Sequence, residues 1–146
     1  MPRQKFWKWA VPLALVVGIG TLARTMNSNP PTNRAQTSPD ATDADLQTRF
    51  YKASLSEVAA KVRALRLSTY GRAWKISLTG APDEIVFRVP VVVFTDVLTV
   101  SFHSQSETET RVDVESHSLV GQGDFGENRR HLRQLLRDLD AVLPRV

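Results

Sequence analysis

The chain has 146 residues, a length typical of a single domain. Its hydrophobic fraction of 42% and charged fraction of 23% are ordinary for a globular protein and exclude a collagen-like or wholly disordered chain. It contains no cysteine, which excludes a disulfide scaffold, a cysteine-ligated metal site and a cysteine nucleophile.

The formal net charge of +4 comes mainly from the N-terminal end of the chain. Residues 1–24 contain four basic side chains and no acidic one, whereas residues 46–146 contain 14 Lys and Arg against 12 Asp and Glu. Binding to nucleic acid requires basic side chains clustered on the folded domain. We therefore expect no nucleic-acid partner.

Residues 9–23 form an uncharged apolar run of fifteen residues after a basic start. One interpretation is a secretory signal peptide. The other is a membrane anchor, residues 1–24, because fifteen helical residues cover about 22 Å of a hydrocarbon core of about 30 Å and Lys8 and Arg24 can reach the headgroups. We favour the single-pass anchor. Since basic residues stay on the cytoplasmic side, both interpretations place the C-terminal part in a periplasmic or lumenal space.

Residues 25–45 contain three prolines, no aromatic residue and almost no large apolar side chain. This composition predicts a disordered linker between the anchor and a domain that spans residues 46–146.

The first helix of the domain is predicted by Ser54 and Glu57, whose spacing is that of a capping box, and by apolar residues at helical spacing up to Leu65. After a strand over 74–79 comes the most apolar stretch of the domain, residues 85–94, in which Pro90 indicates an edge position or a bulge. Because both faces of residues 89–94 are apolar, this part is buried on both sides, or is bulged so that every side chain turns inward, or meets a membrane surface, a lipid tail or an integral-membrane partner.

Residues 97–103 and 111–120 alternate between apolar and polar side chains on either side of a polar loop, which predicts a hairpin. A leucine-rich stripe over 132–143 predicts a last helix that Pro144 ends, with Asp124 able to cap its start. The predicted fold class is α+β: an antiparallel sheet of four to five strands with two helices packed on one face, in the order β-α-β-β-β-β-α, after an N-terminal membrane helix.

A strand of the type RVDV is followed by an S-x-x-G-x-G-D-x-G-x-N turn and a basic helix. This pattern, best matched over 110–139 within a resemblance that begins near Leu46, resembles the bacterial and plastid family known as domain of unknown function 1499. The resemblance implies a fold, a secreted or membrane-tethered setting and a role near thylakoid complexes, but no activity. The family pairs two acids after an aromatic residue, where this chain has Phe94 and Asp96 only. The turn residues matched are Gly121, Gly123, Asp124, Gly126 and Asn128.

Residues 121–126 also spell G-x-G-x-x-G, the fingerprint of a dinucleotide site. That site needs a following parallel strand, for which the 20 residues after Gly126 leave no room beyond the helix, and Asp124 and Glu127 put negative charge where a pyrophosphate would bind. We therefore interpret the glycines as a structural turn. On the helix, Arg130, Arg133 and Arg137 form a basic stripe that is either a solvated face or a site for an anionic headgroup.

No spacing of His103, His117 and His131 indicates a metal site, and no nucleophile motif is present, so we expect neither a metal nor a cofactor. The leading hypothesis is a membrane-tethered, non-catalytic binding module. It binds an apolar or lipid-like ligand, gripped between the sheet and the last helix, or a membrane-protein partner. The candidate contact residues are Val92, Phe94 and Asp96, with the arginine stripe. The alternative is a small hydrolase or a phosphate-binding or nucleotide-binding enzyme that uses the turn from Gly121 to Arg130.

Overall fold

The computed structural model describes residues 33–78, 81–120 and 126–146. The predicted anchor, residues 1–24, lies outside them. Within the described part of the chain, no helix is long and apolar enough to cross a membrane.

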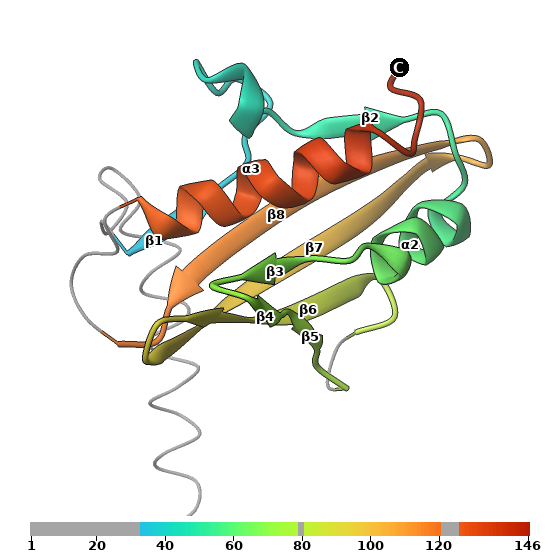
Figure 1. Ribbon diagram of the computed structural model, residues 1–146. Helices are drawn as coiled ribbons and strands as arrows, with labels where there is room; N and C mark the ends of the chain where they lie inside the picture. The colour runs from blue at the N-terminus through green and yellow to red at the C-terminus, as the bar shows by residue number, and fades with distance from the viewer. Residues whose placement is uncertain (1–32, 79–80, 121–125) are drawn as a thin grey trace, which may run out of the picture. The chain divides into compact units, whose positions relative to one another are not determined.

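The main sheet is antiparallel and has the strand order β1-β8-β7-β6-β5, with β2 paired to β8 beside β1 (Figure 1). A separate two-stranded hairpin is formed by β3 and β4. The strands are β1 (Arg34–Gln36), β2 (Arg49–Tyr51), β3 (Ser68–Thr69), β4 (Arg72–Ala73), β5 (Lys75–Ile76), β6 (Glu84–Val91), β7 (Phe94–Ser106) and β8 (Glu109–Ser118).

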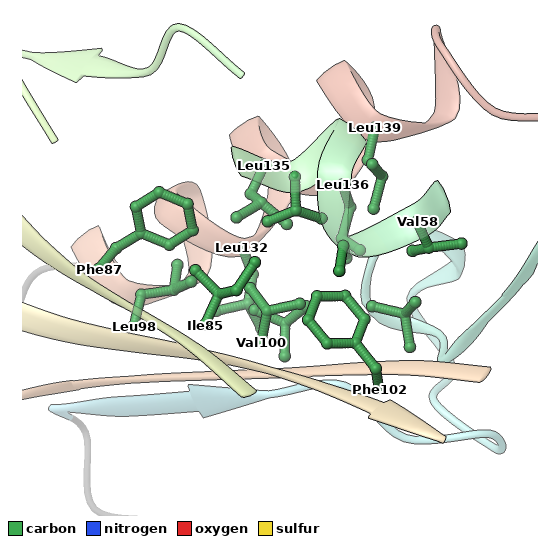
Figure 2. Close-up of a cluster of buried hydrophobic side chains, with 14 of the residues drawn as sticks. Val58, Ile85, Phe87, Leu98, Val100, Phe102, Leu132, Leu135, Leu136 and Leu139 are labelled. Atoms are coloured by element: carbon green, nitrogen blue, oxygen red, sulfur yellow. The ribbon is translucent and has the colours of Figure 1, made fainter. Parts of the chain in front are cut away.

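Two α-helices, α2 (Leu55–Ala64) and α3 (Glu127–Asp140), complete the fold, which is of the predicted α+β class. Over the described residues the main sheet has six strands rather than the predicted four to five. Ser54 and Glu57 form the predicted capping box at the start of α2. Both helices contribute to a single buried cluster on one face of the sheet (Figures 1 and 2). Its central side chains are Val58, Ile85, Phe87, Leu98, Val100, Phe102, Leu132, Leu135, Leu136 and Leu139.

This packing bears on the ligand expected between the sheet and the last helix. The four leucines of α3 are fully buried against the sheet, and side chains of β6 and β7 fill the space beneath them (Figure 2). A ligand gripped there would have to displace the core, since protein interiors are packed without spare volume. An apolar contact therefore has to be sought on the surface.

The prediction of a disordered linker over residues 25–45 is wrong for the C-terminal half of that range. Residues 34–36 form β1, which pairs with β8 from Arg34 opposite His117 to Gln36 opposite Glu115. A short 3₁₀-helix, η1 (Ala44–Leu46), follows, and Thr37 is buried between them. Polar composition hid this segment because short edge elements can be held by backbone and side-chain hydrogen bonds rather than by apolar burial.

The apolar run 85–94 is neither a strand buried on both sides nor a bulge. β6 ends at Val91, which pairs with Phe94 at the start of β7, so Val92 and Val93 are the two central residues of a tight turn. Among the described residues, Pro90 has a strand partner on one side only, Thr95, in keeping with its missing N–H.

Candidate functional site

Several segments converge at the end of the sheet where the β6–β7 turn lies. Asp96 is opposite Ser118, so the last residues of β8 run beside the start of β7. The Ser118 N–H donates to the Asn33 carbonyl oxygen, so the first described residue of the chain also lies at this end. The N-terminus of α3 and the β3–β4 turn lie at the same end (Figure 1).

This end of the sheet carries most of the exposed apolar surface. Six of the ten large hydrophobic side chains that the structure describes as exposed are here, including Val93 at 79% and Phe94 at 52% exposure. Single exposed apolar residues are ordinary on a protein surface, but a gathering of them marks a contact site. We call this region the apolar end; its exposed side chains are Tyr70, Val92, Val93, Phe94, Leu119 and Val120.

The turn at the apolar end is strained. Val92 has a φ of +38°, a conformation that β-branched residues rarely adopt. Neighbouring strands support it: the Arg72 guanidinium donates to the Val92 carbonyl oxygen at 2.7 Å, and the Thr69 hydroxyl donates to the Pro90 carbonyl oxygen. Strain of this kind is retained where the surroundings enforce it and often marks a functional position.

A buried group of ionisable side chains lies behind the turn. Asp96 and His131 are 2% and 1% exposed, and His131 Nδ1 lies 3.5 Å from Asp96 Oδ2. On its other side, His131 Nε2 lies 3.3 Å from Glu127 Oε2, and the Trp74 ring packs edge-on against the imidazole. The imidazole thus links the start of β7 to the first turn of α3.

Glu127 connects this buried group to the surface. Partial burial alone would raise the pKa of Glu127, but hydrogen bonds from Tyr70 and Arg130 and the charges of Arg130 and His131 outweigh it and lower the pKa. The Tyr70 hydroxyl is the donor to Glu127, and the same bond raises the pKa of Tyr70. The β3–β4 turn is therefore fastened to the N-terminus of α3.

The side chain of Asn128 joins the first described residue, Asn33, to the end of β8. Its side-chain amide donates to the Asn33 carbonyl oxygen at 2.7 Å and to Ser118 Oγ at 2.9 Å, and its oxygen accepts from Ser116 Oγ at 2.6 Å. Gly126 has a φ of +79° at the start of α3, so the predicted need for glycine in this turn is met there. Gly121, Gly123 and Asp124 lie outside the described residues.

The predicted contact residues separate into three environments. Val92 and Phe94 are exposed on the turn, whereas Asp96 is buried behind it. In the basic stripe of α3, Arg130 pairs with Glu127, and Arg133 pairs with Asp43 and Asp45. Arg137 lines a small hollow with Asp45, Arg49, Arg133 and Asp140. Nearby carboxylates thus offset much of the positive charge of the stripe.

Sequence reasoning missed the place of His131. A signal was available, because His131 lies four residues before Leu135 and therefore belongs to the buried stripe of α3 rather than to its polar face. Its spacing of four from Glu127 also predicts the contact between them. Within residues 33–78, 81–120 and 126–146, no group of three or more acidic or histidine side chains is placed to hold a metal ion.

The chain belongs to the family described as "Protein of unknown function (DUF1499)", whose model matches residues 21–139. That match begins before the predicted domain boundary at Leu46 and includes β1 and η1. No curated protein matches the chain. Among solved structures, a crystal structure of an HSP90 activator from Plasmodium falciparum is similar, with a TM-score of 0.47 and 11% sequence identity, over 77% of this chain and 99% of that chain.

Proposed function

We propose that this protein is a membrane-tethered, non-catalytic binding module whose apolar end docks on the bilayer surface at the non-cytoplasmic side. The apolar run 9–23 would supply the tether. Docking would hold the domain in one orientation, so that its remaining surface is presented to partners in the membrane.

The observation that carries the proposal is the clustering of exposed apolar side chains at the apolar end, where the first described residue, Asn33, also lies. Val92, Val93 and Phe94 lie on the β6–β7 turn, and Leu119 and Val120 follow the adjacent strand. Each large apolar side chain moved out of water contributes up to about 1.5–3 kcal/mol. Several such side chains on one turn are sufficient for reversible attachment to a lipid interface.

The short length of chain between the apolar run and Asn33 also favours contact of the apolar end with the bilayer. Nine residues, 24–32, separate the apolar run from Asn33, and nine residues of any conformation span at most about 32 Å. The thirteen residues of β7 extend about 40 Å. A membrane anchor at 9–23 would thus hold the apolar end near the bilayer and leave the opposite end of the sheet in solvent.

Cysteine labelling tests the proposal, because the chain has no cysteine of its own. The variants Val93→Cys, at the apolar end, and Glu107→Cys, in the turn at the far end of β7, are expressed as full-length protein in bacterial membranes. A membrane-impermeant maleimide is applied to spheroplasts. We expect position 107 to react rapidly and position 93 about tenfold or more slowly, because lipid excludes water from buried apolar residues.

Two results would overturn the proposal in different ways. If position 107 reacts only after the membranes are permeabilised, the domain lies on the cytoplasmic side. If both positions react at the same rate in spheroplasts, the apolar end does not contact the bilayer.

A further inference from the structure

A basic groove lies next to the apolar end, on the sheet face opposite the helices. Arg88 and Pro90 alternate along β6 with the buried Phe87 and Val89, and the groove has a volume of about 240 Å³. We call it the β5–β6 groove. Its lining residues are Arg72, Ala73, Lys75, Arg88, Pro90 and Thr95.

The cations of this groove are not neutralised by neighbouring acids. No acidic residue lines it, and in the described ranges 33–78, 81–120 and 126–146 none of Arg72, Lys75 and Arg88 forms an ion pair. Lys75 and Arg88 are moreover direct cross-strand partners. Like charges in that position repel and destabilise the sheet, so a bound anion would relieve the repulsion.

This arrangement differs from the arginine stripe of α3. There, Arg130 and Arg133 are paired with carboxylates of the same chain. An incoming anion would have to compete with those carboxylates, whereas no carboxylate of the described residues pairs with the three cations of the β5–β6 groove, of which Arg72 also donates to the Val92 carbonyl oxygen. The groove also contains a hydroxyl, that of Thr95, as an additional donor.

We propose that the β5–β6 groove binds a phosphate group. The tetrahedral oxygens of a phosphate suit two guanidinium groups and an ammonium group converging from different strands. The groove lies beside the turn that is proposed to meet the membrane, since Arg72 contacts the Val92 carbonyl oxygen and Pro90 and Thr95 are a cross-strand pair next to the turn. If the apolar end docks as proposed above, the phosphate is that of an anionic lipid headgroup. The same side chains would also accept a free phosphate monoester.

Two arms of one experiment distinguish these sources. Full-length protein is inserted in nanodiscs of phosphatidylcholine, and the N–H signals of Thr95, Arg72 and Arg88 are followed by NMR. In one arm glycerol phosphate is added to the solution. In the other arm phosphatidylglycerol replaces part of the phosphatidylcholine. Saturable shifts of these signals in either arm are expected, and the arm in which they occur identifies the source.

A pair of matched variants tests whether the groove itself is responsible. Lys75→Gln/Arg88→Gln removes two of its charges, and Lys61→Gln/Arg63→Gln removes two exposed charges from α2. Since each basic residue near an anionic surface contributes about 1 kcal/mol, the groove variant should bind about tenfold to thirtyfold more weakly, and the α2 variant should bind like wild type. The groove variant should also melt no lower than wild type without phosphate, because the repelling pair is gone.

No shift in either arm, or equal weakening by both variants, would overturn the inference. The docking proposal is tested separately when the maleimide labelling of Val93→Cys is repeated in the phosphatidylcholine nanodiscs, because the groove meets no anionic headgroup there. Protection of position 93 without shifts in the groove would therefore refute only the phosphate site.

Discussion

The two ends of strand β7 are both tight two-residue turns, but they are built from opposite kinds of residues. At one end Ser106 pairs with Glu109 across Glu107 and Thr108, which are polar and exposed. At the other end Val91 pairs with Phe94 across Val92 and Val93, which are apolar and just as open to solvent. The polar turn has what a hairpin in water requires. The apolar turn carries side chains that the fold does not need.

The two turns also differ in backbone conformation. No residue of the polar turn has a positive φ, and the Ser106 hydroxyl accepts a hydrogen bond from the Thr108 N–H. At the apolar turn Val92 occupies the left-handed region, where glycine or asparagine would be at ease. A contact of the apolar turn with another surface, as proposed above, would account for both differences.

The largest effect is expected from the buried group behind the apolar turn. His131→Leu removes the imidazole from between Asp96 and Glu127 and should lower the free energy of unfolding by about 3 kcal/mol or more, because the buried Asp96 carboxyl and Glu127 both lose a close contact. Urea denaturation measures this. Adding Asp96→Asn to the His131→Leu variant should recover part of the loss. A loss below about 1 kcal/mol in the single variant would show that the pair is not a structural link.

The second effect is a loss of membrane contact when the apolar turn is made polar. Val92→Ser/Val93→Ser/Phe94→Ser gives the apolar turn the character of the polar one. Because the three side chains are only partly exposed, each contributes about 1 kcal/mol to docking, which predicts a loss on the order of 100-fold. Protection of a Leu119→Cys reporter from maleimide measures the loss. The matched control, Gln105→Ser/Glu107→Ser/Thr108→Ser, should leave protection unchanged. Equal behaviour of the two triple variants would contradict the docking role.

A smaller effect is expected from relief of backbone strain. Val92→Asn should raise the free energy of unfolding by about 1 kcal/mol, since asparagine tolerates a positive φ that costs a β-branched residue energy. Thermal unfolding measures it, and Val93→Asn, next to it in the same turn, is the control. An unchanged or lowered melting temperature for Val92→Asn would show that the turn is not strained.

The smallest effect is a response to acid near the chain entry. Burial lowers the pKa of His117 below its ordinary 6.5, an effect that Arg34 reinforces and Glu115 opposes. Because the folded state favours neutral imidazole, this contribution to stability is present above pH 6.5 and is lost as the pH falls through the lowered pKa. Urea denaturation at pH 7.5 and 5.5 should show a larger loss for wild type than for His117→Gln. Equal losses would contradict this assignment.

The same comparison explains which parts of the fold could be predicted from sequence. The polar loop 104–110 between two alternating strands predicted the hairpin, although the strands continue to Ser106 and from Glu109 and leave a turn of two residues only. The Ser54 and Glu57 pair predicted the start of α2. Pro90 indicated an edge position or a bulge that splits the run 85–94 in two, but the turn at Val92 carries no glycine, asparagine or aspartate, so no local signal predicted a turn there. Only the pairing of β6 with β7 places the break there.

The candidate site was predictable in part. Val92 and Phe94 were singled out because an apolar run with two apolar faces needs a second contact, and the structure places them on the surface. The cation pair of Lys75 and Arg88 was not predictable, since the two residues are thirteen positions apart and meet only through strand register. The link between Asn128 and Asn33 was hidden for the same reason.

Fluorescence quenching by nitroxide-labelled lipids tests the central claim most directly. An environment-sensitive fluorophore is attached to Val93→Cys or to Glu107→Cys of the full-length protein in phosphatidylcholine vesicles, with the nitroxide placed near the headgroup. The account predicts strong quenching and a blue-shifted emission at position 93, with neither at position 107. Equal, weak quenching at the two positions would contradict it, because the apolar end would then lie in water like the polar one.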